Sequence, residues 1–208
     1  MTEFLINAFV TLIVTVDPIG LAPIFLALTT GASSDAKRSV GVRAVIISTS
    51  ILLVFLVAGG QLLSLLGISL AAFRIAGGLL LFWIAFEMVF EKRQQRKSKT
   101  AEQAHDDQTR DISDLAVFPL ALPLTAGPGA ISAVILLSAD APDIVATAGL
   151  AVAVLATMLL VLIGFLAAEK LTAFVSEAVL NVITRLLGVL LAALSVQFVL
   201  DGLSSAGF

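Results

Sequence analysis

Long apolar segments, separated by short polar ones, make up most of the chain. Six apolar segments can be drawn, at roughly 4–30, 44–66, 71–90, 115–138, 144–168 and 180–201. Each is close to the length of about 20 residues that a helix needs to cross the hydrocarbon core of a bilayer. The strict apolar–polar alternation of membrane barrel strands is absent. The pattern therefore predicts an all-α, polytopic membrane protein with six transmembrane helices.

One stretch breaks this pattern. Residues 91–114 are almost entirely polar and divide the chain into two halves of three segments each, 1–90 and 115–208. A segment with so little apolar surface gains little by packing. It is predicted to be a solvated, mobile cytoplasmic loop between the two halves of one membrane domain.

Basic residues indicate the orientation. Eleven of the twelve Lys and Arg residues lie in or beside the loops that follow the first, third and fifth segments; the exception is Arg74. Lys and Arg favour the cytoplasmic side of a membrane. These loops are therefore predicted to be cytoplasmic and both termini to face outward. A mean hydropathy of +1.10 and a charged fraction of 13 % fit an integral membrane protein.

The two halves resemble each other in sequence. Residues 16–28 align with 126–138, pairing Pro18 with Pro128, and residues 74–83 align with 185–194, pairing Arg74 with Arg185. Because three segments is an odd number, the second half is predicted to be inverted relative to the first, as in many transporters. Arg74 and Arg185 are secondary site candidates, although arginines near helix ends commonly reach for the membrane interface instead.

Both predicted helix breaks consist of a capping residue followed by a proline. In "VDPIG", Asp17 is a preferred N-cap and Pro18 suits the first helical position. In "TAGPGAIS", Gly127 takes the cap position, Pro128 the first helical position, and Gly129 permits close approach of a neighbour. The first and fourth transmembrane helices are therefore predicted to be discontinuous.

A helix start inside a membrane offers unpaired N–H groups and a partial positive charge, which suit an anion. The amides of residues 127–129 are predicted to bind a substrate carboxylate, and Asp17 an ammonium group, Na⁺ or a proton. Nearby polar candidates for the cavity lining are Asn7, Thr11, Thr15, Thr125 and Ser132. The structural alternative is that Asp17 only caps its helix and meets no ligand.

Other chemistries find little support in the sequence. There are no enzyme signature motifs and no basic patch interleaved with aromatics, so neither an enzyme nor a nucleic-acid partner is expected. The chain has no cysteine, and its one histidine, His105, has only Asp106 and Asp107 beside it, so no metal or cofactor is expected. Glu87 is expected at the membrane interface.

The segments "FVTLIVTVDPIGLAPIFLALT" and "PLALPLTAGPGAIS" closely resemble the MarC family of bacterial and archaeal inner-membrane proteins. The resemblance covers essentially the whole chain. It points to Asp17, Pro18 and Gly20, together with Gly127, Pro128 and Gly129, as functional positions. Part of that family is classed as six-span transporters of small neutral amino acids.

The function predicted from these observations is a secondary transporter of small neutral amino acids, coupled to H⁺ or Na⁺. Its expected partners are the substrate and the lipid bilayer, with a homo-oligomer as an option. Two alternatives stand beside it: an exporter of another metabolite, drug or lipid-linked substrate, and a membrane scaffold that transports nothing.

Overall fold

The helices begin where the sequence supplies caps. In the computed structural model, which describes residues 1–105, 113–170 and 176–207, Ser33, Ser69, Asp143 and Ser176 each accept a backbone N–H bond at a helix start. Such caps satisfy donors that have no partner within the helix. The cap at Ser33 explains why the second long helix starts about ten residues before the apolar segment predicted at 44–66.

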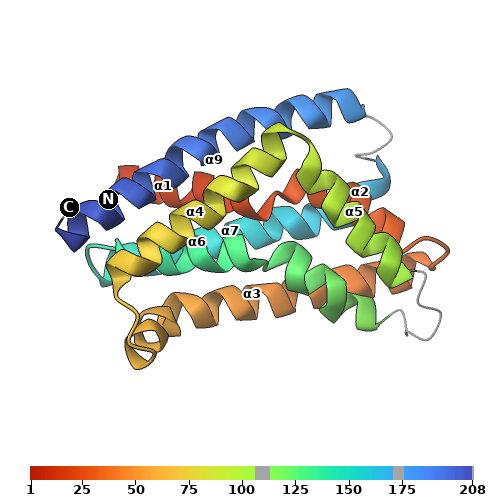
Figure 1. Cartoon of the computed structure of the whole chain (residues 1–208). Coiled ribbons are helices and arrows are strands. Elements are labelled where there is room, and N and C mark those ends of the chain that lie inside the picture. The colour runs from red at the N-terminus through yellow and green to blue at the C-terminus, as the bar shows by residue number, and fades with distance from the viewer. Residues whose placement is uncertain (106–112, 171–175, 208) are drawn as a thin grey trace.

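The described residues are helical almost throughout (Figure 1). The elements are α1 (Thr2–Val16), α2 (Pro18–Leu28), α3 (Ser34–Leu65), α4 (Leu70–Val89), α5 (Lys92–His105), the short η1 (Asp114–Ala116), the irregular η2 (Val117–Thr125), α6 (Pro128–Ala139), α7 (Ile144–Leu166) and α9 (Glu177–Ala206). Figure 1 places both termini at one end of the bundle and α5 toward the other.

The number of membrane spans agrees with the prediction. Within the described residues, five helical stretches are long and apolar enough to cross a membrane, and α1 with α2 forms one of them. The segment Asp114–Thr125 and α6 form a pair bent by 57°, which gives a sixth if counted as one span. The predicted all-α, polytopic fold is confirmed, whereas the inverted relation of the two halves stays a prediction.

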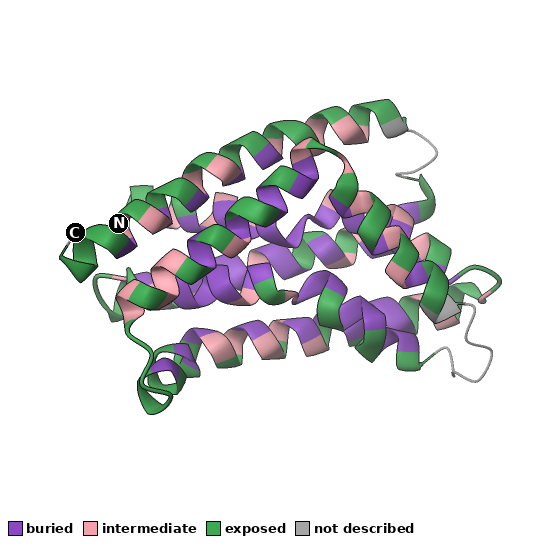
Figure 2. Ribbon diagram, viewed as in Figure 1, coloured by how far each residue is buried: buried purple, intermediate pink, exposed green. Residues whose placement is uncertain are grey.

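Burial follows the expectation for a bundle in lipid. Residues buried in the interior are concentrated in α1, α2 and α6, whereas α9 exposes much of its surface (Figure 2). The exposed side chains of α9 include Val182, Leu186 and Val189, and those of α7 include Leu155 and Leu159. Because lipid tails are as apolar as these side chains, such surfaces are stable in a bilayer.

Helices α4 and α9 pack closely along their length, and glycines make this possible (Figure 1). A Cβ added at Gly78 would lie 2.8 Å from the backbone oxygen of Ser195. A Cβ added at Gly188 would lie 2.9 Å from the Cβ of Met88. Small residues of this kind let membrane helices approach one another.

The prediction for the polar segment was wrong in one respect. Residues 92–105 form helix α5, which packs against α2, α4 and η2 rather than extending into solvent. Ala101 is fully buried, and so is nearly all of the side chains of Arg93 and Lys97, which lie on the same face of α5. The polar side chains fold because they find partners inside the bundle, which composition alone does not reveal.

The close approach at Gly78 yields a stability prediction. Gly78→Ala should lower the free energy of unfolding by about 1–3 kcal/mol, because the new methyl group collides with backbone that cannot turn aside. Gly60→Ala is the matched control: the space around Gly60 is empty within 4 Å. The midpoint of thermal unfolding in detergent measures both. Equal midpoints for the two variants would contradict the packing described here.

Candidate functional site

The first helix break lies at Asp17, between α1 and α2. Asp17 has a left-handed backbone, with φ 61° and ψ 64°, which ends α1 at Val16. Its Oδ1 accepts a hydrogen bond of 3.1 Å from the backbone N–H of Gly20, and Pro18 takes the first position of α2. The predicted N-cap is therefore present, on a carboxylate that is 2 % exposed.

Gly20 is required by the geometry of this cap. A Cβ at position 20 would lie 2.3 Å from Asp17 Oδ2, which is far inside van der Waals contact. The glycine thus leaves the space that the carboxylate occupies. This gives a physical reason for the Asp-Pro-x-Gly spacing in this chain.

Helix α5 contacts the first break through three polar side chains. Arg93 donates to the backbone oxygen of Thr15, in the last turn of α1, where carbonyls lack partners within the helix. Gln94 Nε2 donates to the backbone oxygen of Gly20 at 2.9 Å. Lys97 Nζ donates to Asp17 Oδ2 at 3.2 Å. A cation thus lies at the negative end of α1, and another pairs with the carboxylate at the start of α2.

The Lys97–Asp17 ion pair is almost completely buried, with side-chain exposures of 7 % and 2 %. Burial lowers the pKa of Lys97 to about 8, and the neighbouring Asp17 carboxylate only partly offsets that effect. A second pair joins Arg96 to Glu87 at 2.9 Å. Glu87 is 6 % exposed, and its predicted place at the membrane interface stays a prediction.

The second break lies between η2 and α6. Phe118 and Leu122 have extended backbones inside η2, as residues before proline prefer. Gly127 is the N-cap of α6 and Pro128 its first residue, as predicted, and the cap makes no side-chain hydrogen bond. A Cβ at Gly127 would lie 2.4 Å from the oxygen of Pro123. The amides at the start of α6 therefore have no capping side chain.

A cavity of about 290 Å³ opens at this second break, and we call it the central cavity. It is lined by Thr15, Ile84, Arg93, Arg96, Lys97, Thr100, Pro123, Leu124, Thr125, Gly127, Pro128, Gly129 and Ala130. Its walls thus combine the start of α6 with three basic side chains of α5. Gly129 receives the side chain of Ile84, whose Cδ1 would lie 2.4 Å from an added Cβ.

Thr125 is the polar group in the cavity wall that lacks a partner. Its side chain is 1 % exposed, and its Oγ1 makes no hydrogen bond within the described structure. Leaving a buried hydroxyl unpaired costs about 1–3 kcal/mol. By contrast, Thr15 Oγ1 donates to the Thr11 backbone oxygen at 2.7 Å. Thr125 thus adds a buried hydroxyl without a partner to the wall of the central cavity.

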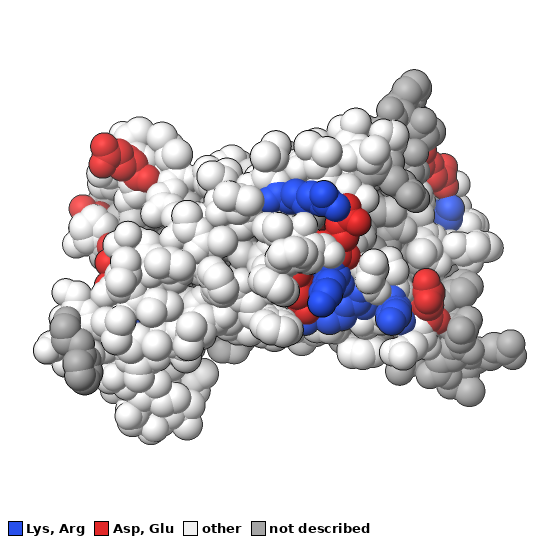
Figure 3. Space-filling model, turned by 45° about the horizontal axis from the view of Figure 1, so that its top comes forward, with Lys and Arg blue, Asp and Glu red and all other residues white. Residues whose placement is uncertain are grey.

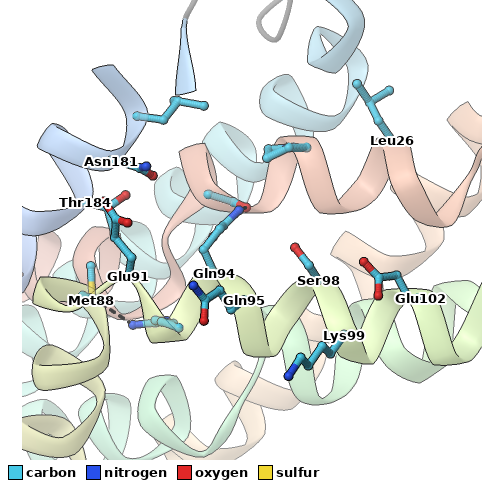
Figure 4. Close-up of a pocket in the computed structure, with 14 residues that line it drawn as sticks. Leu26, Met88, Glu91, Gln94, Gln95, Ser98, Lys99, Glu102, Asn181 and Thr184 are labelled. Atoms are coloured by element: carbon cyan, nitrogen blue, oxygen red, sulfur yellow. Dashed lines mark hydrogen bonds between the residues drawn. The ribbon is translucent and has the colours of Figure 1, made fainter. Parts of the chain in front are cut away.

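A larger hollow of about 650 Å³ lies between α2, α5 and α9, and we call it the vestibule. Figure 4 shows Gln94 reaching from α5 toward α2, with Asn181 and Thr184 projecting from α9. Arg93 lines both the vestibule and the central cavity. Helix α5 therefore separates the two spaces.

The structure brings together only part of the predicted site. Thr15, Thr125, Gly127, Pro128 and Gly129 line the central cavity, whereas Gly20 lines the vestibule. Asp17 and Pro18 lie at the first break and Ser132 lies close to Gly77 of α4, and none of the three lines either space.

The other secondary candidates lie elsewhere. Asn7 accepts a hydrogen bond from Thr11 at 3.4 Å and faces a shallow hollow beside α9. Arg74 pairs with Asp140, and Arg185 pairs with Glu91 at 2.6 Å. Both arginines therefore bind acidic residues at helix ends.

Sequence reasoning missed the contribution of α5. The polar residues that it adds to the central cavity are Arg93, Arg96, Lys97 and Thr100. A signal was available: Arg93, Lys97 and Ala101 recur at every fourth position, which puts them on one helical face. A buried carboxylate such as Asp17 also requires a cationic partner, and this segment holds the largest cluster of basic residues in the chain.

No cluster of His, Cys, Asp and Glu within the described part of the chain could hold a metal ion. The side chain of His105 lies outside the described residues, so the reasoning about that histidine rests on sequence alone.

These features define a class: a polytopic α-helical membrane protein with two interrupted helices around buried charge. Residues 2–206 match the model of the MarC family integral membrane proteins. Relatives include a UPF0056 membrane protein of Archaeoglobus fulgidus, 34 % identical over 97 % of this chain and 93 % of the relative. The UPF0056 membrane protein YvbG of Bacillus subtilis is 33 % identical over 98 % of this chain and 95 % of its own.

The UPF0056 membrane protein YhcE of Escherichia coli is 35 % identical over 94 % of this chain and 89 % of the relative. No solved structure matches. The chain belongs to the MarC family, as the resemblance in its sequence suggested, and is an integral multi-pass membrane protein.

The cap at the first break yields a second stability prediction. Gly20→Ala should lower the free energy of unfolding by about 1–2 kcal/mol or more, because the methyl group expels the Asp17 carboxylate from its cap. Gly164→Ala is the control, since its Cβ would meet nothing closer than the Pro18 oxygen at 3.4 Å. Chemical or thermal unfolding in detergent compares them. A Gly20→Ala variant as stable as Gly164→Ala would show that the cap is not rigid.

Proposed function

We propose that this protein is a secondary transporter of small neutral amino acids, driven by a H⁺ or Na⁺ gradient. The observation that carries the proposal is the central cavity at the start of α6, with its uncapped amides and the unpaired hydroxyl of Thr125. Helix-start amides without a capping side chain, beside basic residues, suit the binding of an anion.

The substrate carboxylate binds at the start of α6. Backbone N–H groups and the positive end of the helix dipole favour an anion there. Arg96, whose side chain is 57 % exposed, adds a guanidinium at the wall. Thr125 Oγ1 supplies one further donor.

The substrate ammonium binds at Asp17, on the first break. A carboxylate that is 2 % exposed in an apolar bundle holds a cation strongly, because the alternative is an uncompensated buried charge. The alternative role of Asp17 is to take the coupling H⁺ or Na⁺ in place of the ammonium. A zwitterion therefore matches the two breaks better than a simple anion or a simple cation does.

Alternating access arises from movement of the two halves around the breaks. The loops rich in Lys and Arg, and α5 with them, face the cytoplasm, and both termini face outward. Figure 3 shows most of the basic side chains in view over the middle and right of the surface, whereas acidic side chains lie on both sides of it. The vestibule is then the cytoplasmic approach to the site.

The size and charge of the central cavity weigh against a large lipid-linked substrate, since the polar lining would leave buried charges facing hydrocarbon. A scaffold that transports nothing predicts that both breaks are filled by protein side chains. The first break is filled, by Arg93 and Lys97, whereas the second opens onto the cavity. The open second break favours a transporter.

Uptake of labelled alanine or glycine by proteoliposomes tests the proposal. Wild type should show uptake that depends on an imposed H⁺ or Na⁺ gradient, and Asp17→Asn should lose it.

Thr125→Val should raise KM about tenfold, because it removes one hydrogen bond to a charged group. It should not lower stability, since that hydroxyl has no partner in the empty site.

Thr157→Val is the matched control, because the Thr157 hydroxyl is buried but donates to Ala153 within α7, away from the cavity. This variant should transport as wild type does. Absence of gradient-dependent uptake by wild type across a panel of neutral amino acids would falsify the proposal.

A further inference from the structure

Lys97 lies between the central cavity and the carboxylate that the proposed substrate needs. Its side chain lines the cavity, and its Nζ contacts Asp17 Oδ2 at 3.2 Å. Asp17 itself does not line the cavity. A solute in the central cavity therefore meets the lysine before it meets the aspartate.

The chemistry of Lys97 duplicates that of the proposed ligand. An alkyl ammonium that enters beside the start of α6 and pairs with a buried carboxylate is what the amine of a small amino acid would provide. The Asp17 cap uses Oδ1 for the Gly20 N–H, which leaves Oδ2 as the oxygen that Lys97 occupies. Asp17 is 2 % exposed, so its Oδ2 has no room for a second amine beside Lys97 Nζ.

Helix α5 is suited to leave this position. It has 14 residues, most of them polar, and isolated helices of that length are marginal in water. Its ion pair carries a large desolvation cost, as buried pairs do. The depressed pKa of Lys97, about 8, reflects the same burial. The docked state is thus held by a few specific contacts rather than by an apolar face.

We propose that the Lys97 ammonium occupies the place of the substrate ammonium at Asp17. Helix α5 then locks the site, and it is released when an amine-bearing solute binds Asp17 instead. The inference rests on the proposed function and adds a regulatory contact to it. The lock involves Asp17 and Lys97 directly, with Arg93, Arg96 and Glu87 as the charged groups around them.

Hydrogen exchange of the α5 amides, measured by mass spectrometry on the full chain in detergent or nanodiscs, tests the lock. Lys97→Met should speed exchange over residues 92–105 about tenfold or more, because it leaves Asp17 unpaired when α5 is docked. Asp17→Asn should do the same by leaving Lys97 unpaired. The double variant should exchange slowly again, since replacing both partners removes the buried pair and leaves neither of its charges without a partner.

Lys92→Met is the matched control: it makes the same substitution at an exposed position of the same helix. Its α5 exchange should equal that of wild type. Lys97→Met exchange no faster than that of Lys92→Met would overturn the lock, whatever the transport assay gives.

Alanine and propionate, which differ by the amino group, test whether an amine displaces Lys97 from Asp17. Alanine should speed α5 exchange in wild type but not in the Asp17→Asn/Lys97→Met double variant, and propionate should do so in neither. Equal effects of the two solutes, or no effect of alanine on a protein that takes it up, would overturn the inference and leave the proposed function standing. Fast exchange in Lys97→Met without uptake of any amino acid would preserve the lock and reject the function.

Discussion

A carboxylate held at a helix break inside an apolar bundle requires a cation, and the site is organised around that requirement. Asp17 caps α2, so it has to lie at the break, and Gly20 leaves the space that it fills. Burial then makes an unpaired charge too costly. The cation comes from α5, a helix too polar to cross a membrane, which lies along α2 for this reason.

The two breaks meet this requirement differently. The first carries its own anion and is closed by Lys97 and Arg93. The second carries no capping side chain and opens onto the central cavity, where Thr125 has a free hydroxyl. The contrast between a satisfied break and an unsatisfied one indicates where a carboxylate binds. The position of Lys97 indicates where an ammonium competes.

The membrane spans and the two helix breaks were predictable from local sequence signals. The apolar segments gave the spans, and the Asp17-Pro18 and Gly127-Pro128 pairs gave both breaks, because caps and proline act within a few residues. The role of α5 was not predictable in the same way. Its buried lysine and arginine depend on partners about 80 residues away, at Asp17 and Thr15. Ser132 was predicted as a site residue because it lies near the second break in sequence, and Arg185 because of the repeat alignment. Neither argument determines where a side chain points.

An experimental structure of the protein with bound L-alanine tests the account most directly. The account predicts the ammonium of alanine within hydrogen-bond distance of Asp17 Oδ2, its carboxylate at the amides that begin α6, and Lys97 withdrawn from the aspartate. An intact Lys97–Asp17 pair with alanine bound elsewhere would contradict it.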